Sequence, residues 1–382
     1  MLVPFEVYVH VPFCARRCGY CDFNTYVAGP ERHAAFVAHA IAEMELAAAE
    51  LEGTPRASAQ SVFFGGGTPT ILPVEGLVEL LEAVRRTFGV APGGEVSAEA
   101  NPDSVDAAYL EGLAAAGFTR VSFGMQSAVP WVLAALDRSH DPARLPDLVA
   151  DARGAGLDVS VDLIYGTPGE TLTDWEASVR AALDLGVDHV SAYALSLEEH
   201  TPMARRIRQG LLAPVDADEQ AAKYVLADEL FSSAGLGWYE ISNWARPGHE
   251  SMHNLGYWTG AEWWGIGPGA HSSLGARRFW NVKSPVAYAD RLTGGASPVA
   301  GEETLDDAAV SLERIMLRSR TSQGLDLDDL SVEGRRTVPG LIADGLAQQR
   351  TGTANAKFVD GIVLTQRGRL LADLVTRTLA GW

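Results

Sequence analysis

The sequence predicts an α/β fold, in which a partial (β/α)6 barrel of parallel strands is followed by a small C-terminal helical domain carrying a β-wing. Two patterns support this prediction. Over about the first 200 residues, runs rich in β-branched and aromatic residues alternate six times with longer segments of helical periodicity. From about residue 300, charged helical segments and short strands replace this alternation. Because six strand–helix units fall short of the eight of a closed barrel, we expect right-handed crossovers and an open or partial closure.

The first strand–helix unit shows the pattern plainly. The stretch FEVYVHV at 5–11 has the composition of a strand, and 31–53 has helical periodicity through Val37, Ile41 and Met44, with Gly53 as a stop signal. The other expected strands cover 61–67, 95–101, 119–127, 157–166 and 187–196. The other expected helices cover 74–88, 104–117, a helical region ending at Gly156, and 172–186. Strand and helix thus alternate as a parallel sheet requires.

Three parts of the chain differ in composition, and we expect domain boundaries between them. Residues 1–235 hold the strand–helix units, 236–298 form an aromatic-rich segment expected to pack on this core, and 299–382 form a winged-helix-like domain. Within and around the last part, the expected elements are a charged helical region at 298–330, a helix at 338–349, short strands at 358–365 and a helix at 366–381.

The composition bounds the function. Of 382 residues, 47% are hydrophobic and 21% charged, as in a globular protein. The net charge of −19 disfavours nucleic acid as a partner, even for a winged domain. The net charge does not exclude a local basic groove, because it averages over all faces of the protein. No apolar run approaches the ~20 residues of a membrane helix, and the first residues lack the features of a signal peptide. We therefore expect the protein in the cytoplasm.

All three cysteines of the chain, Cys14, Cys18 and Cys21, lie within eight residues, with the spacing C-x3-C-x2-C. An odd number of thiols in a reducing compartment does not indicate a disulfide framework. One interpretation is a zinc site with His10 as the fourth ligand, and another is a redox dithiol. A third is a [4Fe–4S] cluster, which usually takes four thiolates, so that three would leave one iron open. An open iron can chelate the amine and carboxylate of S-adenosylmethionine, and electron transfer from the cluster would then yield a 5′-deoxyadenosyl radical.

Further polar and glycine signals follow the expected strands at their carboxyl ends. They are GGGTP after the second strand, Glu99 ending the third, Gln126 ending the fourth, Asp162 ending the fifth and Tyr193 near the end of the sixth. Taken singly, each fits a tight turn or a helix cap. Their agreement on one rim predicts a site at the edge where folds of this type build their active sites.

The cysteine spacing, with Tyr20 directly before Cys21, resembles the signature of the radical S-adenosylmethionine superfamily. The stretches YVHVPFC (8–14), GGGTPT (65–70), GMQS (124–127) and DLIYGTPGE (162–170) resemble the oxygen-independent coproporphyrinogen oxidase branch of that superfamily. The resemblance extends from residue 7 to the C-terminus.

This branch has at least two members, which differ in sequence around the cysteine loop. Its coproporphyrinogen III dehydrogenases carry an N-terminal extension before the cysteine loop and a further cysteine two residues after the third ligand, whereas here the loop begins by residue 12 and that position is Phe23. The HemW-type haem chaperones are similar to this chain in CDFN (21–24) and in the segment 239–258, which contains an H-N-x-x-Y-W motif. The resemblance therefore implies a chaperone that binds haem and delivers it to apo-haemoproteins, with radical decarboxylation of a porphyrinogen as the alternative. Whether the chain is an enzyme stays open, and dehydrogenase activity is not expected.

The resemblance also assigns residues to ligands. For the cluster they are Cys14, Cys18 and Cys21. For S-adenosylmethionine they are Tyr8, Gly66, Gly67, Thr68, Glu99, Gln126, Arg138 and Asp162, with glycine expected where a side chain would block the approach of the ligand. For haem they are His253, Asn254, Tyr257 and Trp258, with His253 preferred as the iron ligand and Tyr257 as its competitor.

The residues alone leave the haem assignment balanced. Five of the nine tryptophans lie between 238 and 264, and flat aromatic faces suit a porphyrin, but such a region equally fits a packing seam between the barrel and the C-terminal domain. As partners the resemblance implies haem, apo-haemoproteins such as respiratory enzymes, and an electron donor. It leaves open a peripheral contact with a membrane and a dimer.

Overall fold

The computed structural model describes residues 3–53, 56–350 and 360–381. It confirms the six predicted strands, which pair in parallel and in sequence order. They are β1 (Phe5–Val11), β2 (Ala59–Gly66), β3 (Val90–Ala100), β4 (Arg120–Gln126), β5 (Asp158–Tyr165) and β6 (His189–Ala194). Along β4 to β6 apolar residues alternate with polar ones, because one face of the sheet packs against the helices and the other lines a cavity on the concave side.

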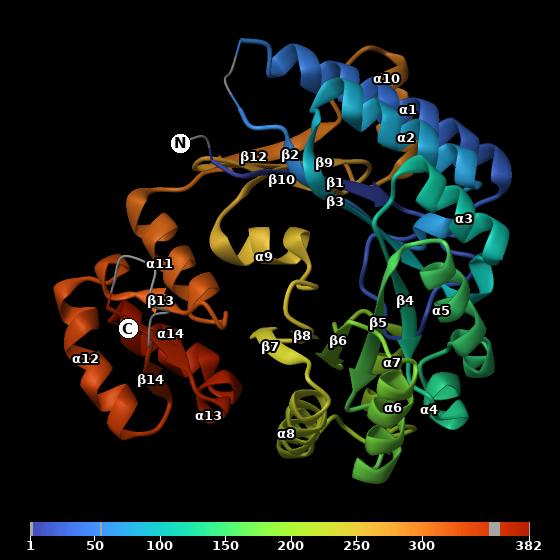
Figure 1. Cartoon of the computed structure of the whole chain (residues 1–382). Helices are drawn as coiled ribbons and strands as arrows, with labels where there is room; N and C mark the ends of the chain where they lie inside the picture. The colour runs from blue at the N-terminus through green and yellow to red at the C-terminus, as the bar shows by residue number, and fades with distance from the viewer. Residues whose placement is uncertain (1–2, 54–55, 351–359, 382) are drawn as a thin grey trace.

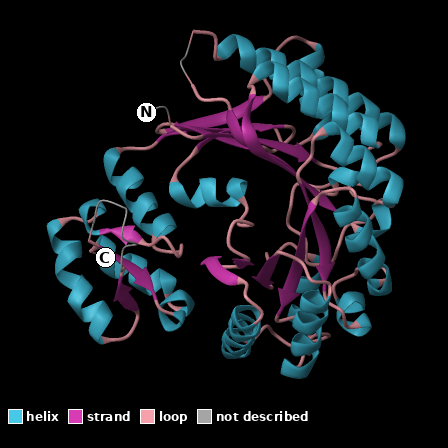
Figure 2. Ribbon diagram, viewed as in Figure 1, coloured by secondary structure: helices cyan, strands magenta, loops and turns pink. Residues whose placement is uncertain are grey.

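The helices that follow these strands cover the outer face of the curved sheet (Figures 1 and 2). They are α1 (Pro30–Glu50), α2 (Val74–Thr87), α3 (Ala107–Ala116), α4 (Pro130–Ala135), α5 (Leu145–Gly154), α6 (Leu172–Asp184), α7 (Pro202–Arg208) and α8 (Ala217–Ser233). Single 3-10 turns lie at Pro69–Ile71, Pro102–Ser104, Pro142–Arg144 and Leu327–Asp329. The strands and helices thus form the predicted (β/α) units, with one large hydrophobic core between them.

The sheet is wider than predicted, because the segment after α8 adds strands at both edges. The twelve-stranded sheet has the order β12-β11-β10-β9-β1-β2-β3-β4-β5-β6-β8-β7. The added strands are β7 (Gly237–Glu240), β8 (Asn243–Ala245), β9 (Glu262–Ile266), β10 (His271–Leu274), β11 (Arg277–Asn281) and β12 (Val299–Thr304). Since β9 pairs with β1 and β8 with β6, the barrel stays open, as expected. The region predicted as helical from 298 begins instead with the edge strand β12. The strand was not predicted because its acidic residues do not alternate regularly with apolar ones.

Helix α9 (Met252–Thr259) lies on the concave side of this open sheet, whereas α10 (Pro285–Thr293) packs against α1 on the outside (Figure 1). The buried Glu95 of β3 holds the start of α9, accepting hydrogen bonds from the Ser251 hydroxyl at 3.2 Å and the Met252 N–H at 3.1 Å. Arg120 of β4 lies 3.3 Å from the same carboxylate. Strands β3 and β4 therefore hold the start of α9.

The C-terminal elements form a separate small core and a three-stranded antiparallel sheet, which confirms the helical domain with a β-wing. They are α11 (Asp307–Arg318), β13 (Leu325–Asp326), α12 (Val332–Ala343), β14 (Ala347–Gln349), β15 (Gly361–Leu364), α13 (Gln366–Leu370) and α14 (Ala372–Ala380). The predicted strand at 358–365 corresponds to β15, and its first two residues lie outside the described part of the chain. Among the described residues, no helix is both long and apolar enough to cross a membrane.

Candidate functional site

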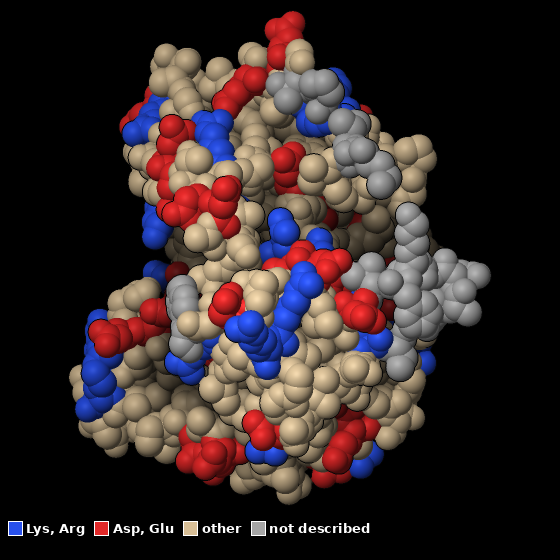
Figure 3. All heavy atoms as spheres, turned by 90° about the vertical axis from the view of Figure 1, so that its left-hand side faces the viewer, with Lys and Arg blue, Asp and Glu red and all other residues tan. Residues whose placement is uncertain are grey.

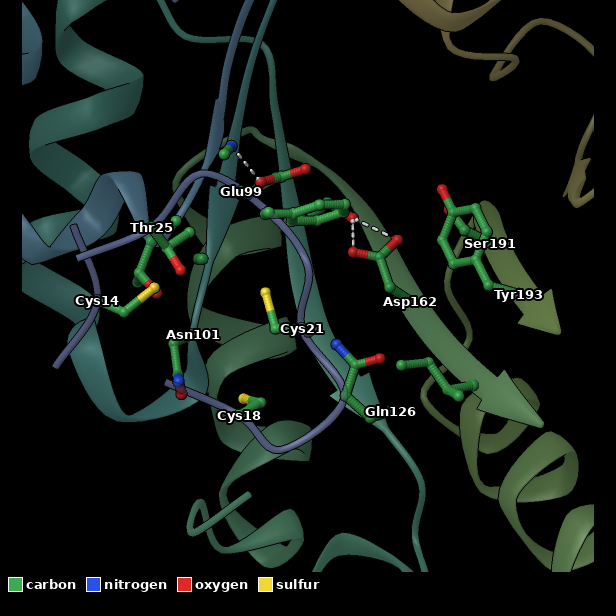
Figure 4. A pocket seen from close by; sticks show the side chains of 18 of the residues that line it. Cys14, Cys18, Cys21, Thr25, Glu99, Asn101, Gln126, Asp162, Ser191 and Tyr193 are labelled. Atoms are coloured by element: carbon green, nitrogen blue, oxygen red, sulfur yellow. Dashed lines mark hydrogen bonds between the residues drawn. The ribbon is translucent and has the colours of Figure 1, made fainter. Parts of the chain in front are cut away.

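A cavity of about 590 Å³ opens on the concave side of the sheet, at the carboxyl ends of the parallel strands. Figure 4 shows the cysteine loop on one side of it and residues of β3 to β6 on the other. Its wall contains every residue predicted for the cluster and S-adenosylmethionine, together with three of the four predicted for haem. They are Tyr8, Cys14, Cys18, Cys21, Gly66, Gly67, Thr68, Glu99, Gln126, Arg138, Asp162, His253, Asn254 and Tyr257. Trp258 lines a different cavity.

The cysteine loop is held by backbone contacts at its two ends, because the Cys14 N–H donates to Tyr26 O at 3.0 Å and the Tyr26 N–H to Pro12 O at 2.7 Å. Donors approach two sulfur atoms: the Thr68 hydroxyl lies 3.8 Å from Cys14 Sγ, and Arg138 Nη1 lies 3.9 Å from Cys18 Sγ. Such donors stabilise thiolate charge, as a metal cluster requires. Burial raises the pKa of Cys14 to about 11, so binding of a metal must displace its proton.

The geometry disfavours the zinc interpretation. Within the described residues, the three sulfur atoms do not form a set lying within 4.8 Å of one another, whereas a tetrahedral zinc ion holds its thiolates about 3.8 Å apart. His10 is unsuited as the fourth ligand, because its Nδ1 bonds the Tyr8 hydroxyl and its Nε2 bonds Asn24 O, both at 3.0 Å.

The glycine loop after β2 has a packing requirement that the sequence did not indicate. That a side chain here would block the ligand stays a prediction. A Cβ on Gly67 would lie 2.4 Å from the backbone oxygen of Phe13, and one on Gly66, whose φ is +108°, would lie 2.5 Å from the His10 ring. The glycines therefore allow β2 to pack against the start of the cysteine loop.

The N–H groups of this loop are also already engaged. Gly66 N–H donates to the Glu99 carboxylate at 3.1 Å, Gly67 N–H to Val11 O at 2.8 Å and Thr68 N–H to Phe13 O at 2.7 Å. Any ligand contact of this backbone would therefore use carbonyl oxygens, which accept hydrogen bonds from an amino group.

Glu99 and Asp162 form a half-buried acidic pair in the cavity wall. Burial and the charge of Asp162 raise the pKa of Glu99 to about 8. Burial also raises the pKa of Asp162 to about 6, although hydrogen bonds from Ser191 and Ser122 oppose this effect. Asp162 was predicted at the end of its strand, but it lies inside β5, three residues before the end, and so sits deeper in the cavity (Figure 4).

Gln126 and Arg138 reach the cavity through irregular backbone. The register of β4 with β5 shifts between Phe123 and Gln126, and Gln126 has φ +61°, which is rare for a residue other than glycine. Arg138 follows α4 and donates to Gly124 O at 2.7 Å. Its Nε is buried and has no partner among the described residues, so part of its guanidinium is available to an anionic group.

Sequence reasoning missed the serines of the cavity wall. Ser97, Ser122, Ser160 and Ser191 all line the cavity. The signal was present in the spacing, because Ser97 and Glu99, Ser160 and Asp162, and Ser191 and Tyr193 are each two residues apart on one strand. Side chains with this spacing lie on one face of a strand.

The H-N-x-x-Y-W motif lies on α9, where most of it packs on the barrel. His253 is buried, with Nδ1 2.8 Å from the Ser61 hydroxyl and Nε2 3.0 Å from the Tyr257 hydroxyl. Its ring stacks on Phe63 at 5.1 Å. Burial lowers the pKa of His253 to about 3 and raises that of Glu6 to about 9, so their contact at 3.5 Å is not an ion pair at neutral pH. Three of the four motif residues thus form one wall of the cluster cavity.

Comparison with known proteins identifies the class. The family model described as the Radical SAM superfamily matches residues 8–182, which include the cysteine loop. The fold is similar to that of coproporphyrinogen III oxidase (HemN) from Escherichia coli, a radical SAM enzyme, with a TM-score of 0.83 and 22% identity over 99% of this chain and 90% of that one. Fold and cysteine loop together define a protein of the radical SAM class.

Relatives along the whole chain identify the family. The heme chaperone HemW of Mycobacterium tuberculosis is 50% identical over 385 residues, covering 99% of this chain and 95% of that protein. The heme chaperone HemW of Bacillus subtilis is 31% identical over 378 residues, covering 98% and 99%. The chain therefore belongs to the HemW family of radical SAM proteins.

Proposed function

We propose that this protein is a haem chaperone that binds haem and delivers it to apo-haemoproteins. The observation that carries the proposal is its identity, over nearly the full length, with proteins named heme chaperone HemW. Phe23 supports it, since this side chain is 60% exposed beside the cysteine loop, at the position where the dehydrogenases that the sequence resembles have a further cysteine.

We further propose that Cys14, Cys18 and Cys21 hold a [4Fe–4S] cluster and that the cavity wall holds S-adenosylmethionine. Together these groups supply reductive cleavage of a sulfonium to a 5′-deoxyadenosyl radical when both are bound. The wall has buried polar atoms without partners among the described residues, namely Thr25 Oγ1, Ser97 Oγ and Arg138 Nε. Unpaired buried polar atoms are costly, so their presence in a cavity supports a polar ligand there.

The chain's own residues have distinct parts in this proposal. Arg138 would pair with the methionine carboxylate, and the carbonyl groups of Gly66 to Thr68 would accept from its amino group. Glu99 and Asp162 would accept from ribose hydroxyl groups, with Gln126 and Tyr8 completing the wall. Closure of the cavity floor by α9 would limit entry of water.

For haem, we propose the region around the H-N-x-x-Y-W motif. His253 as iron ligand stays a prediction, and the geometry sets a condition on it. Both ring nitrogens have partners, so iron would have to replace the Tyr257 hydroxyl at Nε2. Asn254 is likewise engaged, because its amide donates to Glu240 at 2.9 Å and to the Tyr239 hydroxyl at 3.2 Å.

The remaining proposals concern the location, the partners and the domain division of the protein. We propose the cytoplasm as the location, respiratory enzymes among the haem recipients and a separate electron donor for the cluster, with no role for nucleic acid. The acidic composition supports the last point. The proposal does not decide whether the protein contacts a membrane peripherally or forms a dimer. The domain division at 235 and 298 also stays a proposal, although strands from 237 to 304 join the main sheet.

One experiment separates the two candidate functions. The full chain, prepared and reconstituted without oxygen, is given reductant, S-adenosylmethionine and coproporphyrinogen III, and carbon dioxide and protoporphyrinogen IX are measured. A second sample is titrated with haem. We expect haem binding and no sustained decarboxylation. Multiple turnovers would overturn the chaperone proposal and support the dehydrogenase function. The intact cavity wall is the observation that favours this second function.

A further inference from the structure

A second cavity, of about 880 Å³, lies on the other side of the motif and is lined by residues of β9, β10 and helix α11. Tyr8 and Tyr257 line both cavities and so form part of the wall between them. Figure 3 views the molecule from the side of the C-terminal elements and shows the surface hollowed between its upper and lower parts, with basic and acidic side chains at the hollow. The residues predicted for the cluster and for S-adenosylmethionine, Tyr8 apart, do not line this cavity.

One wall of the second cavity is aromatic and rigid. Trp258 and Trp263 line it, and Trp263 is fixed because its indole N–H donates to His271 O at 2.9 Å. Tyr257 packs edge-on against Trp263, with ring centroids 4.8 Å apart and an interplanar angle of 82°. Fixed aromatic side chains of this kind suit a planar, largely apolar ligand.

The opposite wall is the inner stripe of α11. Val310, Glu313, Arg314, Leu317 and Arg318 line the cavity, and their spacing of three and four residues places them on one face of the helix. Val310 and Leu317 add apolar surface opposite the indoles.

Three arginine side chains in the lining of the second cavity have hydrogen-bond donors that their ion pairs do not use. Arg314 Nη1 and Arg318 Nη1 each lie 3.3 Å from an oxygen of the same carboxylate, that of Asp329. Arg278 contributes a third guanidinium, which pairs with Glu313 and lies 5.3 Å from the Trp263 ring centroid. Because two guanidinium groups share one carboxylate at Asp329, a further carboxylate can join them.

A single imidazole faces this space without a partner. His271, on β10, lines the cavity and is exposed, and in the described part of the chain no hydrogen bond reaches its ring. Its ring stacks on Trp280, with centroids 5.8 Å apart. Partial desolvation and the charge of Lys283 lower the pKa of His271, so the imidazole is neutral at pH 7. His253 and His10 differ from it, because both nitrogens of each are engaged.

We propose that the second cavity is the haem site, with His271 as an iron ligand, the Trp258–Trp263 wall against the porphyrin and the arginines of α11 at its propionates. This inference rests on the proposed function, since it names where the cargo binds. An exposed ligand suits a cargo that must be released. Because Tyr257 and Tyr8 belong to both walls, haem in this cavity would contact the wall of the cluster cavity without entering it.

The test uses the full chain titrated with ferric haem, with the Soret band and the dissociation constant as readouts. Variants are His271→Ala and, as a matched control, His200→Ala, an exposed histidine that lines neither cavity. We expect His271→Ala to shift the Soret band and weaken binding at least tenfold, and added imidazole to restore the wild-type spectrum. The control should bind as wild type does.

A second pair of measurements tests the arginines of α11. Arg314→Gln with Arg318→Gln should weaken haem binding, and should have a smaller effect on the dimethyl ester of haem, which has no propionate charge. Wild-type binding of haem with an unchanged spectrum in His271→Ala overturns the inference and leaves the proposed function standing. Failure of the wild-type chain to bind haem overturns the proposed function itself, and the inference with it.

Discussion

The Tyr257 hydroxyl and His253 Nε2 lie 3.0 Å apart, one helical turn from each other on α9. This contact lies between the two cavities, since Tyr257 lines both and His253 only the one that holds the cysteines. Burial and the charge of Glu6 raise the pKa of Tyr257 far above its usual range, so its side chain is a neutral phenol. A neutral phenol is a poor iron ligand, which makes the contact structural.

Tyr257→Phe tests this conclusion. The variant leaves the buried His253 Nε2 without its partner, which should cost about 1–3 kcal/mol in the free energy of unfolding, measured by urea titration. The haem spectrum should stay as in the wild type. A changed Soret band would instead identify Tyr257 as an iron ligand.

The cluster prediction concerns the three thiols. Protein prepared without oxygen should be brown and contain about four irons per chain after reconstitution, because a cubane cluster is the group that three thiolates of this spacing would hold. Cys14→Ala, Cys18→Ala or Cys21→Ala should each abolish the colour. Stoichiometric zinc without iron would contradict the prediction.

Arg138 provides a test of the S-adenosylmethionine site. Arg138→Met removes the guanidinium whose Nε is buried without a partner among the described residues, and should weaken binding of S-adenosylmethionine about 10- to 100-fold, as expected for a lost charge-assisted hydrogen bond. Binding is followed by the electron paramagnetic resonance spectrum of the reduced cluster. If the ligand leaves that spectrum unchanged even in the wild type, the site itself is refuted.

Gly67→Val distinguishes the two explanations for the glycine loop. A side chain that only blocked the ligand would leave the apo protein as stable as the wild type. Because a Cβ here would lie 2.4 Å from Phe13 O, we expect the apo protein to lose stability and the cysteine loop to lose its cluster. Thermal unfolding and iron content measure the two effects.

The sequence predicted the strand–helix units well, because β-branched and aromatic residues recur along strands such as β1 and β5, which are followed by Pro12 and Gly166. It did not predict that β9 pairs with β1 or that β12 is a strand. The first depends on a contact between segments more than 250 residues apart, as in the pairing of Phe5 with Glu262, which no local pattern encodes. The second is an exposed edge strand whose residues, such as Glu302 and Glu303, do not alternate.

For the site, residue types and strand ends were sufficient to predict a set of residues that, Trp258 apart, line one cavity. The direction of a side chain was harder to predict. A Cβ at Gly66 or Gly67 would meet neighbouring protein atoms, and Asp162 lies within β5 and not at its end. His271 was not among the residues predicted for haem, because the sequence does not show which histidine rings have hydrogen-bond partners.

The Glu99 carboxyl predicts a pH dependence of stability. In the unfolded chain this group loses its proton near pH 4.5, whereas the folded chain holds it until the raised pKa of Glu99, about 8. Between these values the folded state binds more protons, so the free energy of unfolding falls as pH rises, by at most about 1.4 kcal/mol per pH unit from this group. Glu99→Gln should flatten the profile of the cluster-free protein in urea titrations at several pH values, and Glu111→Gln, an exposed carboxyl on α3, should not. A profile unchanged by Glu99→Gln would contradict the assignment.

The last prediction concerns the contact between the C-terminal domain and the barrel. Arg369 of α13 donates to both oxygens of Asp228 on α8, at 2.8 and 2.5 Å, and its guanidinium lies 4.4 Å from the Trp238 ring centroid. The two side chains are 7% and 11% exposed, so the pair is largely removed from water. Breaking such a pair leaves one buried charge uncompensated.

Arg369→Met should therefore cost about 3–5 kcal/mol in the free energy of unfolding, and the double variant with Asp228→Asn should recover part of that loss, because the uncompensated charge is removed. Arg335→Met is the matched control, since its ion pair with Asp328 has side chains 47% and 80% exposed and should contribute at most about 1 kcal/mol. Amide hydrogen exchange should show earlier opening of α13 and α14 in Arg369→Met while β1 to β6 stay protected. Equal losses in Arg369→Met and the control would show that this contact does not hold the domain in place.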